Sequence, residues 1–206
     1  MTDQVRRINK ERIVYHGGVL KIPHHIDVIP ENWKRSAAEV ESLMSLLAIQ
    51  LKNFNKIMGK NKDKIRFIVI GNRSKLSASL QKSIAKIEEE TKNNTEMTAF
   101  IAINYGGRDE ILHSVKEIAC EISAGKMRED EINETVFRKF LYTADAPDPD
   151  LLIRTSGEER ISNFLLWQMA YTEFYFDDGW WPDFSMDRLL AAVRAYSRRQ
   201  RRYGGS

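Results

Sequence analysis

Polar side chains suited to holding a phosphate gather between Asp148 and Phe184. They comprise two arginines, two hydroxyls, an amide and a carboxylate, at Arg154, Thr155, Arg160, Ser162, Asn163 and Glu173. Arginine offers planar pairs of donors that match phosphate oxygens, and serine adds a hydroxyl donor. A carboxylate beside bound phosphate most often holds Mg²⁺, which bridges the phosphate oxygens. This segment therefore predicts a diphosphate site with a magnesium ion at Glu173.

The residues before this segment predict the strand that positions it. The run 150–154 (Asp-Leu-Leu-Ile-Arg) reads as a buried strand, because its apolar residues follow the turn signal Ala146-Pro-Asp-Pro149. Ligands of open parallel sheets collect at the carboxyl ends of the strands. We therefore expect Arg154 and Thr155 to project into a site.

Strand and helix patterns alternate along the rest of the chain. Apolar runs bounded by turn residues predict strands over 64–70, 97–103, 150–154 and 174–176. Helical periodicity predicts helices over 36–58, 76–90, 108–124, 134–141, 164–170 and 187–201. This alternation is typical of an α/β fold, with a central, mostly parallel β-sheet flanked by helices.

Three segments resemble those of one known family, the cis-prenyltransferases, and most of all its bacterial undecaprenyl diphosphate synthases, also called isoprenyl transferases. The longest comprises residues 154–168, Tyr171, Glu173, Phe176 and 181–184. Residues 31–44 resemble the family's E-N-W-x-R segment, and residues 103–111 resemble its N-Y-G-G-R strand-to-helix turn. The resemblance implies a cis-prenyltransferase-like domain over residues 31–206, with the undecaprenyl diphosphate synthase-like fold. Residues 1–30 form a divergent N-terminal segment.

The resemblance implies a prenyl-transfer reaction. Isopentenyl diphosphate would condense with an allylic diphosphate, such as farnesyl diphosphate, to give a cis-polyprenyl diphosphate lipid carrier. Mg²⁺, with Glu173 as its ligand, would neutralise the departing pyrophosphate. Asn32 would assist removal of a proton from isopentenyl diphosphate. The residues that would bind substrate are Trp33, Arg35, Arg154, Arg160, Ile161, Ser162, Arg202 and Gly204.

Residues 1–30 depart from the family pattern. Family members carry an M-D-G-N-x-R-W loop whose aspartate binds Mg²⁺ and diphosphate, and no such loop occurs between Met1 and Pro30. The break is abrupt, which predicts a truncated, frameshifted or alternatively started product that is nearly inactive alone and lacks the family's first strand. A substitute strand is expected at Ile13-Val-Tyr15 or at 19–22 (Val-Leu-Lys-Ile).

Three alternatives stay open at this point. The chain is an enzyme of the family, a non-catalytic partner subunit of a cis-prenyltransferase dimer, or a basic-tailed protein that binds RNA or membranes on the same fold. The signature residues favour the first and argue against the last. The apolar stripe of Leu47, Leu51 and Phe54 likewise has two interpretations, core packing on the sheet or the lining of a product tunnel.

Composition agrees with a single domain that has no membrane span. The chain has 206 residues, a net charge of +3 and no apolar run of about 20 residues, so we expect a cytoplasmic protein, associated with membranes at most peripherally. The basic tail 198–205 is a solvated helix end, an attractor of nucleic acid or anionic lipid, or the family's R-x-G ending. We favour the last, which implies a homodimer and no nucleic-acid partner. Cys120, the single cysteine, excludes an internal disulfide and is expected to be buried.

Overall fold

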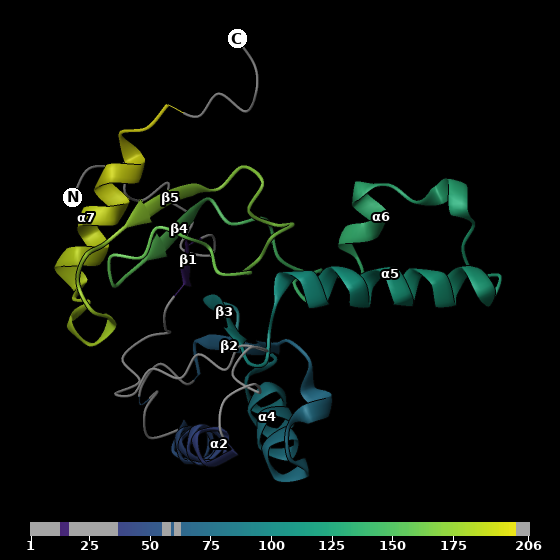
Figure 1. The fold of residues 1–206 in the computed structure, drawn as a ribbon, viewed down its shortest axis with the longest axis horizontal. Helices are drawn as coiled ribbons and strands as arrows, with labels where there is room; N and C mark the ends of the chain where they lie inside the picture. The colour runs from purple at the N-terminus through teal and green to yellow at the C-terminus, as the bar shows by residue number, and fades with distance from the viewer. Residues whose placement is uncertain (1–12, 17–36, 55–58, 60–62, 201–206) are drawn as a thin grey trace.

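The computed structural model describes residues 13–16, 37–54, 59 and 63–200, and all its strand pairs are parallel. Strands and helices alternate, which confirms the predicted α/β class (Figure 1). The order is β1 (Ile13–His16), α2 (Ala37–Lys52), β2 (Ile65–Ile70), α4 (Ala78–Thr91), β3 (Met97–Ala102), α5 (Gly107–Ser123), α6 (Glu134–Arg138), β4 (Leu151–Arg154), β5 (Glu173–Phe176) and α7 (Met186–Ser197).

The described strands form two sheets, where the sequence predicted one. One sheet has the order β1-β4-β5 and the other pairs β2 with β3. A single hydrophobic cluster joins them, because Ile70 of β2 and Leu152 of β4 pack in the same core. In Figure 1, α2 and α4 lie on the far side of the β2–β3 pair from the other sheet, and α7 lies beside β4 and β5.

Strand β1 lies where the sequence predicted a strand, at Ile13-Val-Tyr15. It pairs in parallel with β4, with Ile13 beside Leu151 and His16 beside Arg154. In the strand order β1-β4-β5, it occupies the edge of β4 opposite β5. The alternative run, 19–22, lies outside the described residues.

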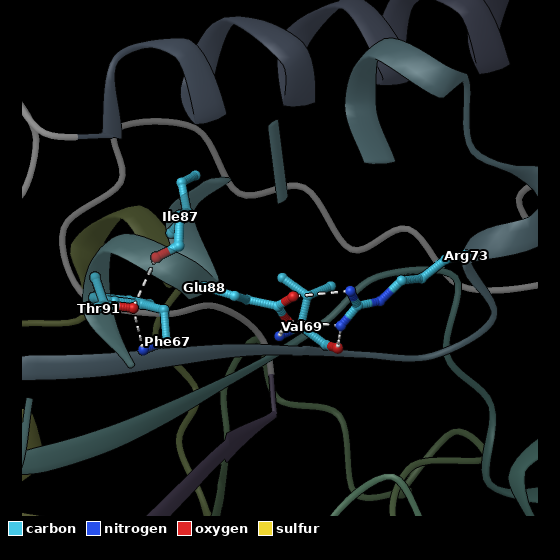
Figure 2. A network of polar contacts seen from close by, with 6 residues as sticks. All are labelled: Phe67, Val69, Arg73, Ile87, Glu88 and Thr91. Carbon is cyan, nitrogen blue, oxygen red and sulfur yellow. Dashed lines mark hydrogen bonds and ion pairs between the residues drawn. The ribbon is translucent and has the colours of Figure 1, made fainter. Parts of the chain in front are cut away.

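The outer edge of β2 is covered by side chains, most of them from α4 (Figure 2). Because the Ile70 carbonyl bonds to β3, the backbone groups of Phe67 and Val69 point to the opposite edge. There the Thr91 hydroxyl accepts from the Phe67 amide at 3.1 Å, and the Glu88 carboxylate accepts from the Val69 amide at 2.8 Å. Arg73 completes the cover by donating to both Glu88 and the Val69 carbonyl.

The apolar stripe of α2 packs in the core. Leu47 is buried with residues of β2 and α4. Phe54, just beyond the helix, meets Phe67 edge-to-face with ring centroids 4.6 Å apart. This is the core-packing interpretation; a tunnel lined by these residues stays a prediction.

Two expectations about local structure are wrong. The helix predicted over 164–170 is a series of turns, because Leu165 has a φ of 40°, which interrupts the right-handed helix. Cys120 is exposed, so it is not the buried hydrophobe that its position in a helical pattern predicted. Among the described residues, no helix combines the length and apolar character needed to cross a bilayer.

Candidate functional site

The carboxyl end of β4 is where the predicted site begins. Arg154 is the last residue of this strand and is half-buried. Thr155 is only 4% exposed, so it does not project into an open site as expected. The chain then turns through Ser156 and Gly157, both at positive φ, and their amides donate to carbonyls of the segment that follows β5.

That facing segment contains acids that the sequence analysis did not single out. The Asp177 amide donates to the Arg154 carbonyl at 2.7 Å, which places Asp177 beside the end of β4. Its side chain is 7% exposed and pairs with Arg188 of α7. Asp178 is exposed, and its carboxylate lies 3.7 Å from the position a Cβ on Gly157 would occupy. Parallel strands end at a common edge of the sheet, and these acids follow β5 directly in the sequence. Their position could therefore have predicted that they lie near the end of β4.

Residues 158–163 carry the predicted diphosphate-binding side chains. Arg160 is exposed and forms an ion pair with Glu158. Ile161 packs against the core cluster that contains Leu152 and Leu165. Ser162 is half-buried and has a φ of 45°. The apolar Ile161 thus anchors the loop between the exposed Arg160 and the half-buried Ser162.

The next residue, Asn163, is hydrogen-bonded to the start of α5. Its carbonyl accepts from the Gly107 amide at 2.6 Å, and its side-chain oxygen accepts from the Arg108 amide at 2.9 Å. Gly106, the residue at the N-cap position of α5, makes no side-chain cap of its own. The first two amide donors of α5 are therefore already satisfied, so they do not form a phosphate cradle.

Below this junction lies a buried carboxylate. Glu110 is 1% exposed and accepts from the Tyr105 hydroxyl at 2.6 Å, the Tyr142 amide at 2.9 Å and the Gln168 amide at 3.0 Å. Burial, and secondarily the charge of Glu110, raises the pKa of Tyr105 far above its usual range. Gln168 also donates to Thr143 at 2.9 Å. This network ties the segment after the loop to α5.

The structure does not bring Glu173 to the arginine site. It is the first residue of β5 and pairs in register with Leu151, whereas Arg154 pairs with Phe176. The two positions are therefore at opposite ends of the strands, about 10 Å apart at roughly 3.3 Å per residue. The Glu173 carboxylate instead accepts from Arg199 at 2.7 Å, and Arg199 also donates to the Phe174 carbonyl at 2.8 Å.

The metal prediction has little support from the described residues. No group of three or more His, Cys, Asp or Glu side chains among them is arranged to hold a metal ion. Glu173 is paired with Arg199, so its assignment as a magnesium ligand stays a prediction. The remaining predicted site residues, Asn32, Trp33, Arg35, Arg202 and Gly204, lie outside the described residues.

Two open hollows, of about 410 and 510 Å³, lie next to Ile68 and Tyr142. The larger is lined by Arg73, His113 and Lys116 among others, and its histidine stacks on Tyr142 at 5.1 Å. Neither hollow is lined by the predicted diphosphate-binding residues. They are thus separate from the end of β4.

Comparison with known proteins identifies the family. A model of the family described as "Putative undecaprenyl diphosphate synthase" matches residues 28–204. The chain belongs to this family. The resemblance predicted from three segments is therefore confirmed, together with the cis-prenyltransferase class of enzyme that it implied.

Individual relatives agree. The chain is 51% identical over 174 residues to a tritrans,polycis-undecaprenyl-diphosphate synthase (geranylgeranyl-diphosphate specific) of Thermoplasma volcanium, covering 84% of this chain and 67% of the relative. It is also 51% identical over 175 residues to an isoprenyl transferase of Fusobacterium nucleatum, covering 85% and 72%. Among solved structures, lavandulyl diphosphate synthase from Lavandula x intermedia, in complex with dimethylallyl diphosphate, superposes with a TM-score of 0.80 at 38% identity, covering 86% and 76%.

Proposed function

We propose that this cis-prenyltransferase condenses isopentenyl diphosphate with an allylic diphosphate, such as farnesyl diphosphate, to build a cis-polyprenyl diphosphate lipid carrier. The observation that carries the proposal is the family match over residues 28–204, which includes the arginine and serine side chains at the end of β4. Relatives named as isoprenyl transferases and polyprenyl diphosphate synthases support the same reaction class.

The roles follow from the chemistry of the side chains. Arg154, Arg160 and Ser162 hold the diphosphate of isopentenyl diphosphate through charge-assisted hydrogen bonds. Ile161, packed in the core, fixes the loop between them. Positioning of this kind can supply several kcal/mol of a barrier, because reacting groups are held in a productive geometry. The carbon–carbon bond forms as pyrophosphate leaves the allylic carbon, and a proton is lost from the isopentenyl unit.

Further residues enter the proposal through family resemblance. Asn32 assists the proton loss, while Trp33 and Arg35 position the substrates. Arg202 and Gly204 reach the diphosphate site of a second copy in a homodimer. Peripheral association of a cytoplasmic enzyme with membranes would suit an apolar product.

Magnesium is proposed as the ion that accompanies the diphosphates, with Glu173 as a candidate ligand. When bound, Mg²⁺ stabilises the charge of the departing pyrophosphate. The described residues do not assemble a site for it, and Arg199 pairs with Glu173. We therefore derive no step through the metal.

Turnover by this chain alone is proposed to be slow. Residues 1–30 contain no M-D-G-N-x-R-W loop, which in the family supplies an aspartate for the allylic diphosphate. The same observation favours a second candidate function, that of a non-catalytic partner subunit in a cis-prenyltransferase dimer. Such a subunit would add its R-x-G tail to a complete enzyme.

Calorimetry and radiolabelling test these proposals separately. The purified chain should bind isopentenyl diphosphate in a calorimeter, and Arg154→Ala should weaken that binding at least tenfold, about 1.4 kcal/mol. Absence of binding by the unaltered chain would contradict the proposed function. Incorporation of labelled isopentenyl diphosphate into longer chains should be trivial, and near-normal Mg²⁺-dependent incorporation would contradict the slow-turnover proposal. Stimulation of a complete family member by this chain would support the partner role.

A further inference from the structure

We propose that Asn163 is a positioning residue, which sets the diphosphate-binding loop by acting as the N-cap that α5 lacks. The inference rests on the proposed function, because it concerns the loop that carries Arg160 and Ser162. Asn163 does not need to touch substrate in this role. It fixes the backbone from which its neighbour Ser162 extends.

The cap is supplied from a distant part of the chain. Asn163 lies 55 residues after Arg108, yet its side-chain oxygen accepts from the Arg108 amide at 2.9 Å. Its carbonyl accepts from the Gly107 amide at 2.6 Å. Other helices of this protein are capped by the residue that directly precedes them. In α6, for example, the Asn133 side chain accepts from the Val136 amide. At α5 the local N-cap residue is Gly106, which has no side chain to offer.

The loop needs such an anchor because its backbone is unusual. Ser162, Asn163 and Leu165 have φ values of 45°, 61° and 40°. Left-handed conformations are uncommon for residues other than glycine, and they persist where surrounding structure holds them. Both hydrogen bonds from α5 fall on Asn163, in the middle of this stretch. The anchor therefore acts where the backbone is least favourable.

Close packing fixes the same junction from a second side. A Cβ on Gly107 would lie 2.7 Å from Leu166 Cγ and 3.0 Å from the Leu166 nitrogen. The absence of a side chain at Gly107 is thus what lets the loop approach the helix closely enough for the Asn163 bonds. Ser162 sits directly before the anchored residue, so the position of its hydroxyl depends on the anchor.

The test compares substrate affinity with stability in two variants and one matched control. Asn163→Gly removes the side-chain acceptor and tolerates positive φ, whereas Asn163→Ala removes the acceptor and adds strain. The control, Asn133→Ala, removes a side-chain cap of the same chemistry from α6. Isopentenyl diphosphate and inorganic pyrophosphate are titrated into each protein in a calorimeter, and melting temperatures are recorded in parallel.

Asn163→Gly is expected to raise the Kd of both ligands about twofold, because glycine is the mildest replacement for a capping residue. Asn163→Ala should raise the Kd further. Asn133→Ala should lower the melting temperature without changing either Kd. If Asn163→Gly lowers stability and leaves both Kd values unchanged, Asn163 is only a structural cap and the inference is overturned.

A third variant separates this inference from the proposed function. If Arg160→Ala weakens binding while Asn163→Gly does not, the positioning role fails and the site stands. If the unaltered chain does not bind isopentenyl diphosphate, the proposed function itself fails. Should the Asn163 variants not fold, hydrogen exchange of the unaltered chain decides: ligand binding should slow exchange of the Arg108 amide, and unchanged exchange would overturn the proposal.

Discussion

The Tyr105 hydroxyl donates a 2.6 Å hydrogen bond to the Glu110 carboxylate in the interior of the protein. Tyr105 lies between β3 and α5, Glu110 lies in the first turn of α5, and both are at most 3% exposed. Glu110 also accepts from the backbone of Tyr142 and the side chain of Gln168. One carboxylate therefore connects α5 with two later segments of the chain.

Removing this carboxylate should destabilise the fold severely. Glu110→Ala leaves the Tyr105 hydroxyl and the Tyr142 amide without an acceptor, while the Gln168 amide keeps Thr143. Each donor left unsatisfied costs about 1–3 kcal/mol, so a loss of roughly 2 kcal/mol or more is expected. Urea unfolding monitored by circular dichroism measures it. Glu117→Ala, at an exposed position of the same helix, is the control and should change stability little. If the two substitutions lower the free energy of unfolding equally, the hydrogen bonds to Glu110 do not contribute measurably to stability.

Alkaline pH should weaken the fold through the buried tyrosines. Burial, and secondarily the charge of Asp109, raises the pKa of Tyr142 from 10.0 to about 12. The unfolded chain releases this proton near pH 10 and the folded chain holds it, so the contribution is complete below that pH. It is lost as the pH rises from about 10 through about 12.

Unfolding midpoints in urea between pH 8 and pH 11.5 check this expectation. Tyr142→Phe should reduce the steepness of the alkaline loss, whereas Tyr171→Phe, at a position 69% exposed, should not. A stability that is flat across this range would contradict the predicted linkage.

Gly107→Ala should disturb the junction between α5 and the loop. The added methyl would meet Leu166, including its backbone nitrogen at 3.0 Å, so overpacking should cost roughly 1–3 kcal/mol despite the better helix propensity of alanine. Gly125→Ala is a useful comparison, because a Cβ there meets nothing within 4 Å and only the positive φ is penalised. If Gly107→Ala weakens pyrophosphate binding and Gly125→Ala does not, the substitution at the start of α5 alters the diphosphate-binding loop.

Arg199 should compete with a cation for Glu173. If Glu173 is a magnesium ligand as proposed, Arg199→Ala frees its carboxylate and should tighten Mg²⁺ binding about threefold, the scale of a part-exposed ion pair. Calorimetric titration of Mg²⁺ in the presence of isopentenyl diphosphate measures it. Arg198→Ala removes the same charge from the neighbouring position and controls for net charge. If Arg199→Ala and Arg198→Ala bind Mg²⁺ equally well, and Glu173→Gln does not change Mg²⁺ binding either, Glu173 is not a magnesium ligand.

The elements that the sequence predicted well are those with strong local patterns. Strand β2 is an apolar run that ends at a glycine, and α5 has regular apolar spacing between two glycine turns, so both were placed within a few residues. The run 164–170 has the same apolar character, but Leu165 is left-handed. That conformation arises where the loop docks on α5, and no local pattern encodes the docking.

Site residues divide in the same way. Arg154 was placed at the end of β4 because apolar residues and a turn define that strand. Glu173 was grouped with it because the two are close in sequence, yet the parallel register sets them at opposite ends of the sheet. The pairing of Asn163 with α5 spans 55 residues and depends on a glycine contact, which sequence spacing alone does not reveal.

The side chains along the outer edge of β2 also limit how the protein can associate. Foreign strands join a sheet by bonding to free backbone groups at its edge. On this edge the Ile65 and Val69 carbonyls and the Phe67 and Val69 amides already bond to side chains of α4 and its flanking residues. Addition of a foreign strand at this edge would first require these side chains to give up their bonds, so the docking of α4 protects the edge of β2 as well as stabilising the fold.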